Sequence, residues 1–247
     1  MSIEKFTEDI RAAFAFSRRS IVLGGAVYEN KPVSKLTVQI PLSTVNRHGL
    51  IAGATGTGKT KSMQRFAESL SEEGVNVLLM DVKGDISGLA AEGTENDKIK
   101  ERMDAIGVSW KPAGYPTELM TISNEKGVRL RATVSEFGPV LFSKILELND
   151  NQQGAVAVIF KYCDDKKLPL LDIKDFRAAI QHLSGAGKKE MEENYGGIST
   201  STFNVIMRKL LELEQQGGDK FFGEKSFEVE DLLQKNPEGK GFINIIR

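Results

Sequence analysis

The pattern of apolar and polar positions in the first part of the chain predicts one helix followed by two short strands. Residues 2–16 place apolar side chains at helical intervals behind Ser2, a good N-cap residue, so we expect an amphipathic helix there. Two runs rich in β-branched residues follow, at 20–23 and 36–40, separated by the turn-like segments Gly24-Gly25 and Asn30-Lys31-Pro32. These runs predict a small N-terminal β-platform.

A strand, a loop and a helix are predicted next, in that order. Residues 49–52 form a short apolar run suited to a buried parallel strand, and residues 59–70 place apolar side chains at helical spacing. A second apolar run, 75–80, ends at Asp81. Together these segments predict a βαβ unit.

The rest of the chain is mainly helical by the same criterion. The pattern predicts helices and strands in the following segments: a charged helix at 97–106, short strands within 107–122, a strand at 128–134, helices at 140–148, 152–162, 173–183 and 199–214, and a last strand at 241–246. The fold class expected is α/β, with a helical insertion of roughly a hundred residues. The domain division expected is an N-terminal helix with short strands at 1–45, a core segment at 46–135, the helical insertion at 136–238 and the start of a returning core strand at 239–247.

A complete phosphate-loop pattern lies between the first predicted core strand and its helix. Gly53, Gly58, Lys59 and Thr60 fill the template G-x-x-x-x-G-K-[ST], the Walker A pattern. Glycines allow backbone conformations that turn successive N–H groups toward a polyphosphate, and the start of the following helix adds its positive dipole end. We therefore expect ATP to be bound with Mg²⁺ by the residues Gly53, Thr55, Gly56, Thr57, Gly58, Lys59, Thr60 and Lys61.

Within this loop, two side chains have the chemistry that nucleotide hydrolysis needs. Lys59 supplies a mobile positive charge for the β and γ phosphates, and the hydroxyl of Thr60 is a ligand for Mg²⁺. Hydrolysis further requires an acid on a neighbouring strand. Asp81 is the one acid that follows a suitable apolar run, so it is the candidate metal ligand and catalytic acid. A purely structural role, with Asp81 ending the strand and Asp85 capping the next turn, stays open.

Composition and charge limit the function classes without choosing among them. Hydrophobic residues make up 40% and charged residues 27% of the chain, as in globular proteins, and no apolar run approaches the roughly 18 residues of a membrane helix. A single cysteine, Cys163, excludes an internal disulfide and a cysteine-based zinc site. Together with an N-terminus unlike a signal peptide, this favours a cytoplasmic protein. The net charge of −1 gives no composition-level argument for nucleic acid binding.

The residues of the phosphate loop, His48 to Thr60, together with the segment from Asp81 to Asp85, resemble the HerA/FtsK superfamily of P-loop ATPases. The likeness is greatest to the bacterial YjgR-like, helicase HerA-like proteins, and it extends through the segments 131–135, 138–141, 146–149 and 211–219. It therefore covers nearly the whole chain.

This resemblance implies a RecA-like P-loop NTPase core that uses ATP and Mg²⁺, and a homo-oligomeric ring. In the better-known members of the superfamily this ring is a hexamer that moves DNA. An arginine from a neighbouring subunit is implied as well, for which Arg208 is a candidate. Superfamily members carry an Asp-Glu pair on a strand beyond the region matched here. We therefore expect this chain to correspond to an N-terminal portion of such a protein, with weak or no turnover.

Two functions from different classes follow. The first is an ATP-binding motor domain of HerA/FtsK type, a helicase-like hydrolase that couples ATP hydrolysis to DNA translocation in a ring. The alternative is a nucleotide-gated assembly module that binds ATP without translocation or appreciable hydrolysis. A GTPase is disfavoured because the chain lacks an [NT]-K-x-D element, and a small-molecule kinase because no arginine-rich lid is present.

Overall fold

The chain divides into two units, each with a hydrophobic core of its own. The computed structural model describes all 247 residues. The first unit comprises residues 1–119 and 229–247, and the second comprises residues 120–228. The first contains the elements α1 (Ile3–Ala13), β1 (Ser20–Tyr28), β2 (Lys31–Pro41), α2 (Lys59–Glu72), β3 (Val77–Met80), α3 (Asp97–Ile106), most of β4 (Thr117–Thr121) and β6 (Ile243–Ile246).

The N-terminal helix and the two predicted strands are confirmed, although the strands are longer than the apolar runs. β1 and β2 form an antiparallel hairpin whose two turn residues, Glu29 and Asn30, both have positive φ, at 46° and 61°. Two consecutive positive φ angles match the twist of the strands that such a turn joins. The predicted turn at Gly24-Gly25 is wrong, because both residues lie inside β1, next to irregularities in its pairing. Gly25 instead makes room for α3, since a Cβ there would lie 2.4 Å from Cγ2 of Ile106.

The strand predicted at residues 49–52 is absent. These residues form no strand, and the side chain of Leu50 is 90% exposed. A strand is stabilised by hydrogen bonds to a neighbouring strand, and no β-strand pairs with this segment. An apolar run is therefore not enough to make a strand where a pairing partner is missing.

The other predicted core strands form a parallel sheet of mixed α/β architecture, which confirms the α/β class. The strand order is β3-β6-β4-β5, with β5 at Val128–Arg129. β3 pairs with β6 in parallel, and β4 pairs in parallel with β5. The predicted strands at 75–80 and 241–246 are thus present, somewhat shortened, as β3 and β6. Of the segments 107–122 and 128–134, only β4 and the two-residue β5 are strands.

The helix α2 packs on this sheet through a small core. Its members come from α2, from the turn after β3, from the segment before β4 and from β6, and the buried ones are Ala67, Ile86, Leu89, Tyr115, Ile243 and Ile245. The C-terminal end of α2 is also attached to the approach to β6. The Ser71 hydroxyl donates to the carbonyl of Gly241 at 2.6 Å, and the Gly241 N–H donates to the carbonyl of Ser71 at 2.9 Å.

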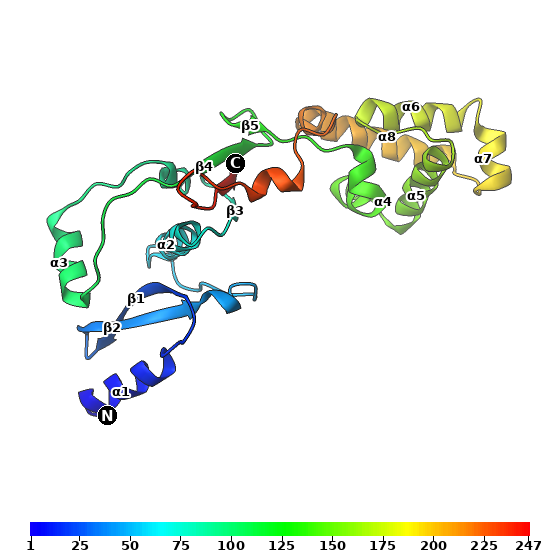
Figure 1. Cartoon of the computed structure of the whole chain (residues 1–247). Coiled ribbons are helices and arrows are strands. Elements are labelled where there is room, and N and C mark those ends of the chain that lie inside the picture. Colours follow the sequence, from blue (N-terminus) through cyan, green and yellow to red (C-terminus); the bar gives the residue numbers. More distant parts are fainter. The chain divides into compact units, whose positions relative to one another are not determined.

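The second unit, residues 120–228, contains the predicted helices beyond residue 136 (Figure 1). Its helices are α4 (Val134–Ile145), α5 (Asp150–Asp165), α6 (Ile173–Ser184), α7 (Lys188–Asn194), α8 (Thr200–Gln215) and α9 (Gly218–Phe221). The four predicted helices are confirmed as α4, α5, α6 and α8, and the short α7 and α9 are additional. α4 begins earlier than predicted because Thr133 and Glu136 form a reciprocal capping box. Gly138, with φ at 66°, interrupts the helical geometry just before Pro139.

Aromatic rings form the centre of the second unit's core. Phe142 and Phe176 are fully buried, with ring centroids 4.9 Å apart at an angle of 66°, and Phe160 and Phe222 pack against Phe142. Such tilted and edge-to-face pairs add to the free energy gained by burial alone. Cys163 is buried in the same core, as a packed thiol whose pKa is raised to about 11 by burial. No helix in either unit has the length and apolar character needed to cross a membrane.

Candidate nucleotide-binding site

The predicted phosphate loop is an exposed turn that leads directly into α2. Gly56 and Gly58 have φ angles of +81° and +98°, in the region that side chains disfavour, so glycine is required at both positions. Gly58 is the N-cap residue of α2 and provides no side-chain hydrogen bond to the helix. The first N–H groups of α2, beginning with that of Lys59, therefore lack a side-chain partner. An uncapped helix start of this kind is able to bind an anion.

Two side chains of the loop donate to the same carbonyl, that of Ala54. The Thr57 hydroxyl donates to the carbonyl of Ala54 at 2.8 Å, and the Lys59 ammonium donates to the same carbonyl at 2.7 Å. Lys59 is thus folded back over the loop. A Cβ on Gly53 would lie 2.6 Å from Oγ1 of Thr57, so the absence of a side chain at Gly53 is what allows this turn to close.

The remaining predicted loop residues lie around this turn. Thr55 is exposed, and Thr60 is half-buried in the first turn of α2. Lys61, the next residue of the helix, is exposed. The structure thus groups Gly53, Thr57, Gly58 and Lys59 tightly, with Thr60 and Lys61 at the adjoining helix start.

Asp81 has a different environment from the loop. Its side chain is buried, at 4% exposure, and accepts three backbone hydrogen bonds from the turn that follows β3. Oδ1 accepts from Gly84 at 2.8 Å and from Asp85 at 3.2 Å, and Oδ2 accepts from Ile86 at 3.0 Å. No hydrogen bond or ion pair joins Asp81 to the phosphate loop. The geometry shows a turn-stabilising carboxylate, and its role in metal binding or catalysis stays a prediction.

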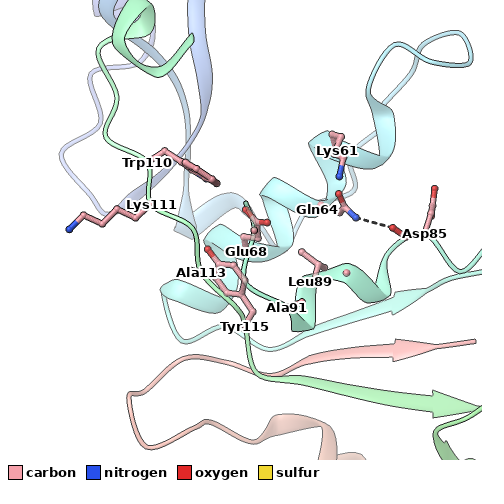
Figure 2. A pocket seen from close by; sticks show the side chains of 12 residues that line it. Lys61, Gln64, Glu68, Asp85, Leu89, Ala91, Trp110, Lys111, Ala113 and Tyr115 are labelled. Atoms are coloured by element: carbon pink, nitrogen blue, oxygen red, sulfur yellow. Dashed lines mark hydrogen bonds between the residues drawn. The ribbon is translucent and has the colours of Figure 1, made fainter. Parts of the chain in front are cut away.

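A second contact ties this turn to α2. The Gln64 amide donates to the carbonyl of Asp85 at 3.0 Å, the dashed line in Figure 2. Gln64 lies on α2, five positions beyond Lys59, so the turn closed by Asp81 is attached to the helix that begins at the phosphate loop.

A cavity of about 230 Å³, which we call the polar cavity, lies on this flank of α2 (Figure 2). Its lining includes Lys61, Gln64, Glu68, Asp85, Trp110, Lys111 and Tyr115. In Figure 2 the Lys111 side chain points away from the other lining side chains.

The polar cavity contains two groups whose pKa is raised. Burial raises the pKa of Glu68, against the opposing effect of Arg65, whose guanidinium lies 3.6 Å from the Glu68 carboxylate. Burial also raises the pKa of Tyr115, and so does Glu72, which accepts a hydrogen bond from the Tyr115 hydroxyl at 2.7 Å. These groups make the flank polar and partly acidic.

A larger cavity of about 620 Å³, which we call the apolar cavity, borders the phosphate-loop segment. It is lined by Leu23, Ile40, Thr44, Val45, Arg47, His48, Gly49, Leu50, Ile51, Ser62 and Phe66. The sequence alone did not indicate this cavity. Its only signal was the apolar character of the predicted β-platform, which predicts a packing face but not a hollow beside it.

No group of three or more His, Cys, Asp and Glu side chains is placed to hold a metal ion. A magnesium ion bound together with a nucleotide does not need such a group, because phosphates and waters supply most of its ligands. The one protein ligand that the motif predicts, the Thr60 hydroxyl, lies in the first turn of α2.

Arg208, the candidate arginine for a neighbouring subunit, lies on α8 of the second unit and is exposed. This position leaves its side chain accessible. Its predicted role stays a prediction.

Comparison with known families matches residues 28–247 to the family described as helicase HerA-like C-terminal. The match includes the phosphate loop, the turn after β3 and the whole helical unit. A search of curated proteins found no match.

Proposed function

The chain belongs to the helicase HerA-like C-terminal family, and on this premise we propose that residues 53–61 bind ATP together with Mg²⁺ as part of a RecA-like P-loop core. In this proposal the phosphates lie on the loop N–H groups and the start of α2. The protein would act in a homo-oligomeric ring that couples ATP hydrolysis to movement along DNA.

The observation that supports nucleotide binding best is the uncapped start of α2 behind two glycines of positive φ. Unpaired N–H groups and the positive end of the helix dipole favour an anion at this place. Lys59 lies over the same turn, where its ammonium donates to the Ala54 carbonyl. On phosphate binding, Lys59 would exchange this neutral carbonyl for a charged oxygen, which makes a stronger hydrogen bond.

Thr60 is the residue that would hold Mg²⁺, since its hydroxyl follows the loop lysine in the first turn of α2. Bound there, the ion would neutralise charge on the phosphates. The other residues proposed to bind the nucleotide would supply backbone N–H donors and a second positive charge; they are Gly53, Thr55, Gly56, Thr57, Gly58 and Lys61.

One observation favours the alternative, a nucleotide-gated assembly module with little hydrolysis. Both carboxylate oxygens of Asp81 accept backbone hydrogen bonds from the turn after β3, and no hydrogen bond joins Asp81 to the phosphate loop in this conformation. A protein that binds ATP without hydrolysing it would still change its assembly, because ligand binding stabilises the conformation that binds it. Salt-sensitive DNA binding would favour the motor, and salt-insensitive, ATP-dependent oligomerisation would favour the module.

The proposal is tested by replacing the loop lysine. Lys59→Ala is expected to lower the affinity for Mg-ATP by at least about tenfold, because a charge-assisted hydrogen bond to phosphate is lost. The matched control is Lys111→Ala, which removes the same charge from an exposed side chain outside the phosphate loop. Affinity is measured by titration calorimetry, with thermal unfolding to verify the fold. Unchanged affinity in Lys59→Ala would contradict the assignment of the phosphate loop.

A further inference from the structure

We propose that the apolar cavity binds the base and ribose of the nucleotide whose phosphates lie on the loop. This inference rests on the proposed function and goes beyond it by placing the nucleoside. It assigns a binding role to the β1–β2 hairpin, and in particular to Leu23 and Ile40, which the phosphate-loop motif does not include.

The position of the cavity is the first argument. Its lining contains Thr44, Val45 and the run from Arg47 to Ile51, all before Gly53, together with Ser62 and Phe66 of α2. Ser62 follows Lys59 by three positions, about one helical turn, so the cavity adjoins the helix start where the phosphates would lie. A nucleotide with its phosphates at Lys59 has this cavity beside it.

The size and polarity of the cavity are the second argument. A volume of about 620 Å³ falls within the range of roughly 300–1,000 Å³ typical of small-molecule sites, whereas the polar cavity, at about 230 Å³, falls below it. A purine ring has flat apolar faces, and the cavity offers it the ring of Phe66 and the aliphatic side chains of Leu23 and Ile40. Ring faces of this kind favour stacking on a base.

The distribution of charge is the third argument. No acidic residue lines the apolar cavity, and Arg47 lines it. The polar cavity on the other flank of α2 is lined by two acidic residues, Glu68 and Asp85, and by two lysines, Lys61 and Lys111. Its charges balance, so it offers a polyanionic ligand no excess of positive charge. Of the two cavities beside the phosphate loop, the apolar cavity therefore suits a nucleoside triphosphate better.

The test separates binding of the nucleoside from binding of the phosphates. The affinities of ATP and of inorganic tripolyphosphate, each with Mg²⁺, are measured for the wild-type chain, Phe66→Ala and Leu23→Gln. Loss of the ring is expected to weaken ATP binding by about ten- to a hundredfold, the usual effect of losing a base-stacking aromatic, with tripolyphosphate affinity changed less than about twofold. Leu23→Gln replaces an exposed side chain by a neutral polar one. It should also lower the affinity for ATP, without altering the charge near the phosphates.

Leu78→Gln is the matched control, because Leu78 is an exposed leucine of β3 that lines neither cavity. Wild-type affinity for ATP in both Phe66→Ala and Leu23→Gln would overturn the inference. So would quenching of Trp110 fluorescence by ATP but not by tripolyphosphate, since Trp110 is the only tryptophan and lines the polar cavity. If the wild-type chain binds neither ligand, the proposed phosphate site itself fails, which is a separate result.

Discussion

At the scale of single residues, Asp81 shows why a motif position needs its surroundings before it is given a role. The sequence places an acid at the end of a strand beside the phosphate loop, and the structure shows it buried and closing a turn. Buried carboxylates that accept several backbone hydrogen bonds contribute to stability through those bonds. A loss of activity on mutation of Asp81 would therefore not by itself identify a catalytic acid.

We predict that Asp81→Asn destabilises the chain even without nucleotide. In asparagine an NH₂ group, which cannot accept a hydrogen bond, replaces one of the two carboxylate oxygens. At least one backbone N–H group of the turn would then lose its acceptor, at a cost of about 1–3 kcal/mol. Urea-induced unfolding measures this free energy. Asp85→Asn is the control, because Asp85 is exposed and joins the turn through its backbone. Equal stability of Asp81→Asn and wild type would contradict the structural role.

The backbone conformation of the loop glycines follows from the sequence at this scale, whereas nucleotide binding by the loop stays a prediction. Gly56 and Gly58 indeed have positive φ, and Gly53 lies where no Cβ fits. The sequence could not show that the Lys59 ammonium donates to the Ala54 carbonyl. That contact depends on the three-dimensional path of the turn.

At the scale of elements, prediction succeeded where the signal was local and failed where it required a partner. The helix predicted at 97–106 is α3, with Asn96 as its N-cap and Gly107 at its end. α8 likewise begins after Ser199, whose hydroxyl accepts from the N–H of Thr202. The apolar segment 49–52 forms no strand, because a strand needs hydrogen bonds to another strand, which can lie far away in the sequence. The cavity beside it was unpredictable for the same reason.

One glycine near the C-terminus is predicted to control how β6 joins the sheet. A Cβ at Gly241 would lie 2.3 Å from the carbonyl oxygen of Val75, and both atoms belong to backbone or are fixed to it. Gly241→Ala must therefore separate the approach to β6 from the end of α2 and strain the buried hydrogen bonds to Ser71. We expect a loss of at least about 2 kcal/mol in unfolding free energy, within the range for overpacked sites.

The control for this change is Gly24→Ala in β1, where nothing lies within 4 Å of the added Cβ. Beyond the difference in strand propensity between glycine and alanine, Gly24→Ala should alter the free energy of unfolding by less than about 0.5 kcal/mol. Chemical denaturation of both variants gives the comparison. If Gly241→Ala and Gly24→Ala were equally stable, the close approach of Gly241 to Val75 would be wrong.

At the scale of the whole molecule, the two cores are made of different residues and different elements. The phosphate loop, both cavities and the parallel strands β3 and β6 belong to the first unit, and the aromatic core of α4, α5 and α6 belongs to the second. The sequence indicated a helical region of this kind from its periodicity. The predicted domain limits, 46–135 and 136–238, stay a prediction. The two compact units of the structure have their boundaries after residues 119 and 228.

Separate cores predict separate responses to a core mutation, and Phe142→Ala is the sharpest case. Phe142 is fully buried and contacts three other aromatic rings, so its truncation should destabilise the second unit by about 3–5 kcal/mol. Far-UV circular dichroism reports mainly the helices of the second unit, whereas Trp110 fluorescence reports the first. We expect the circular dichroism transition to move to lower urea while the Trp110 transition and the affinity for ATP stay unchanged. If both transitions moved together, the two units would unfold as one cooperative body, and helical contacts would have to stabilise the nucleotide site as well.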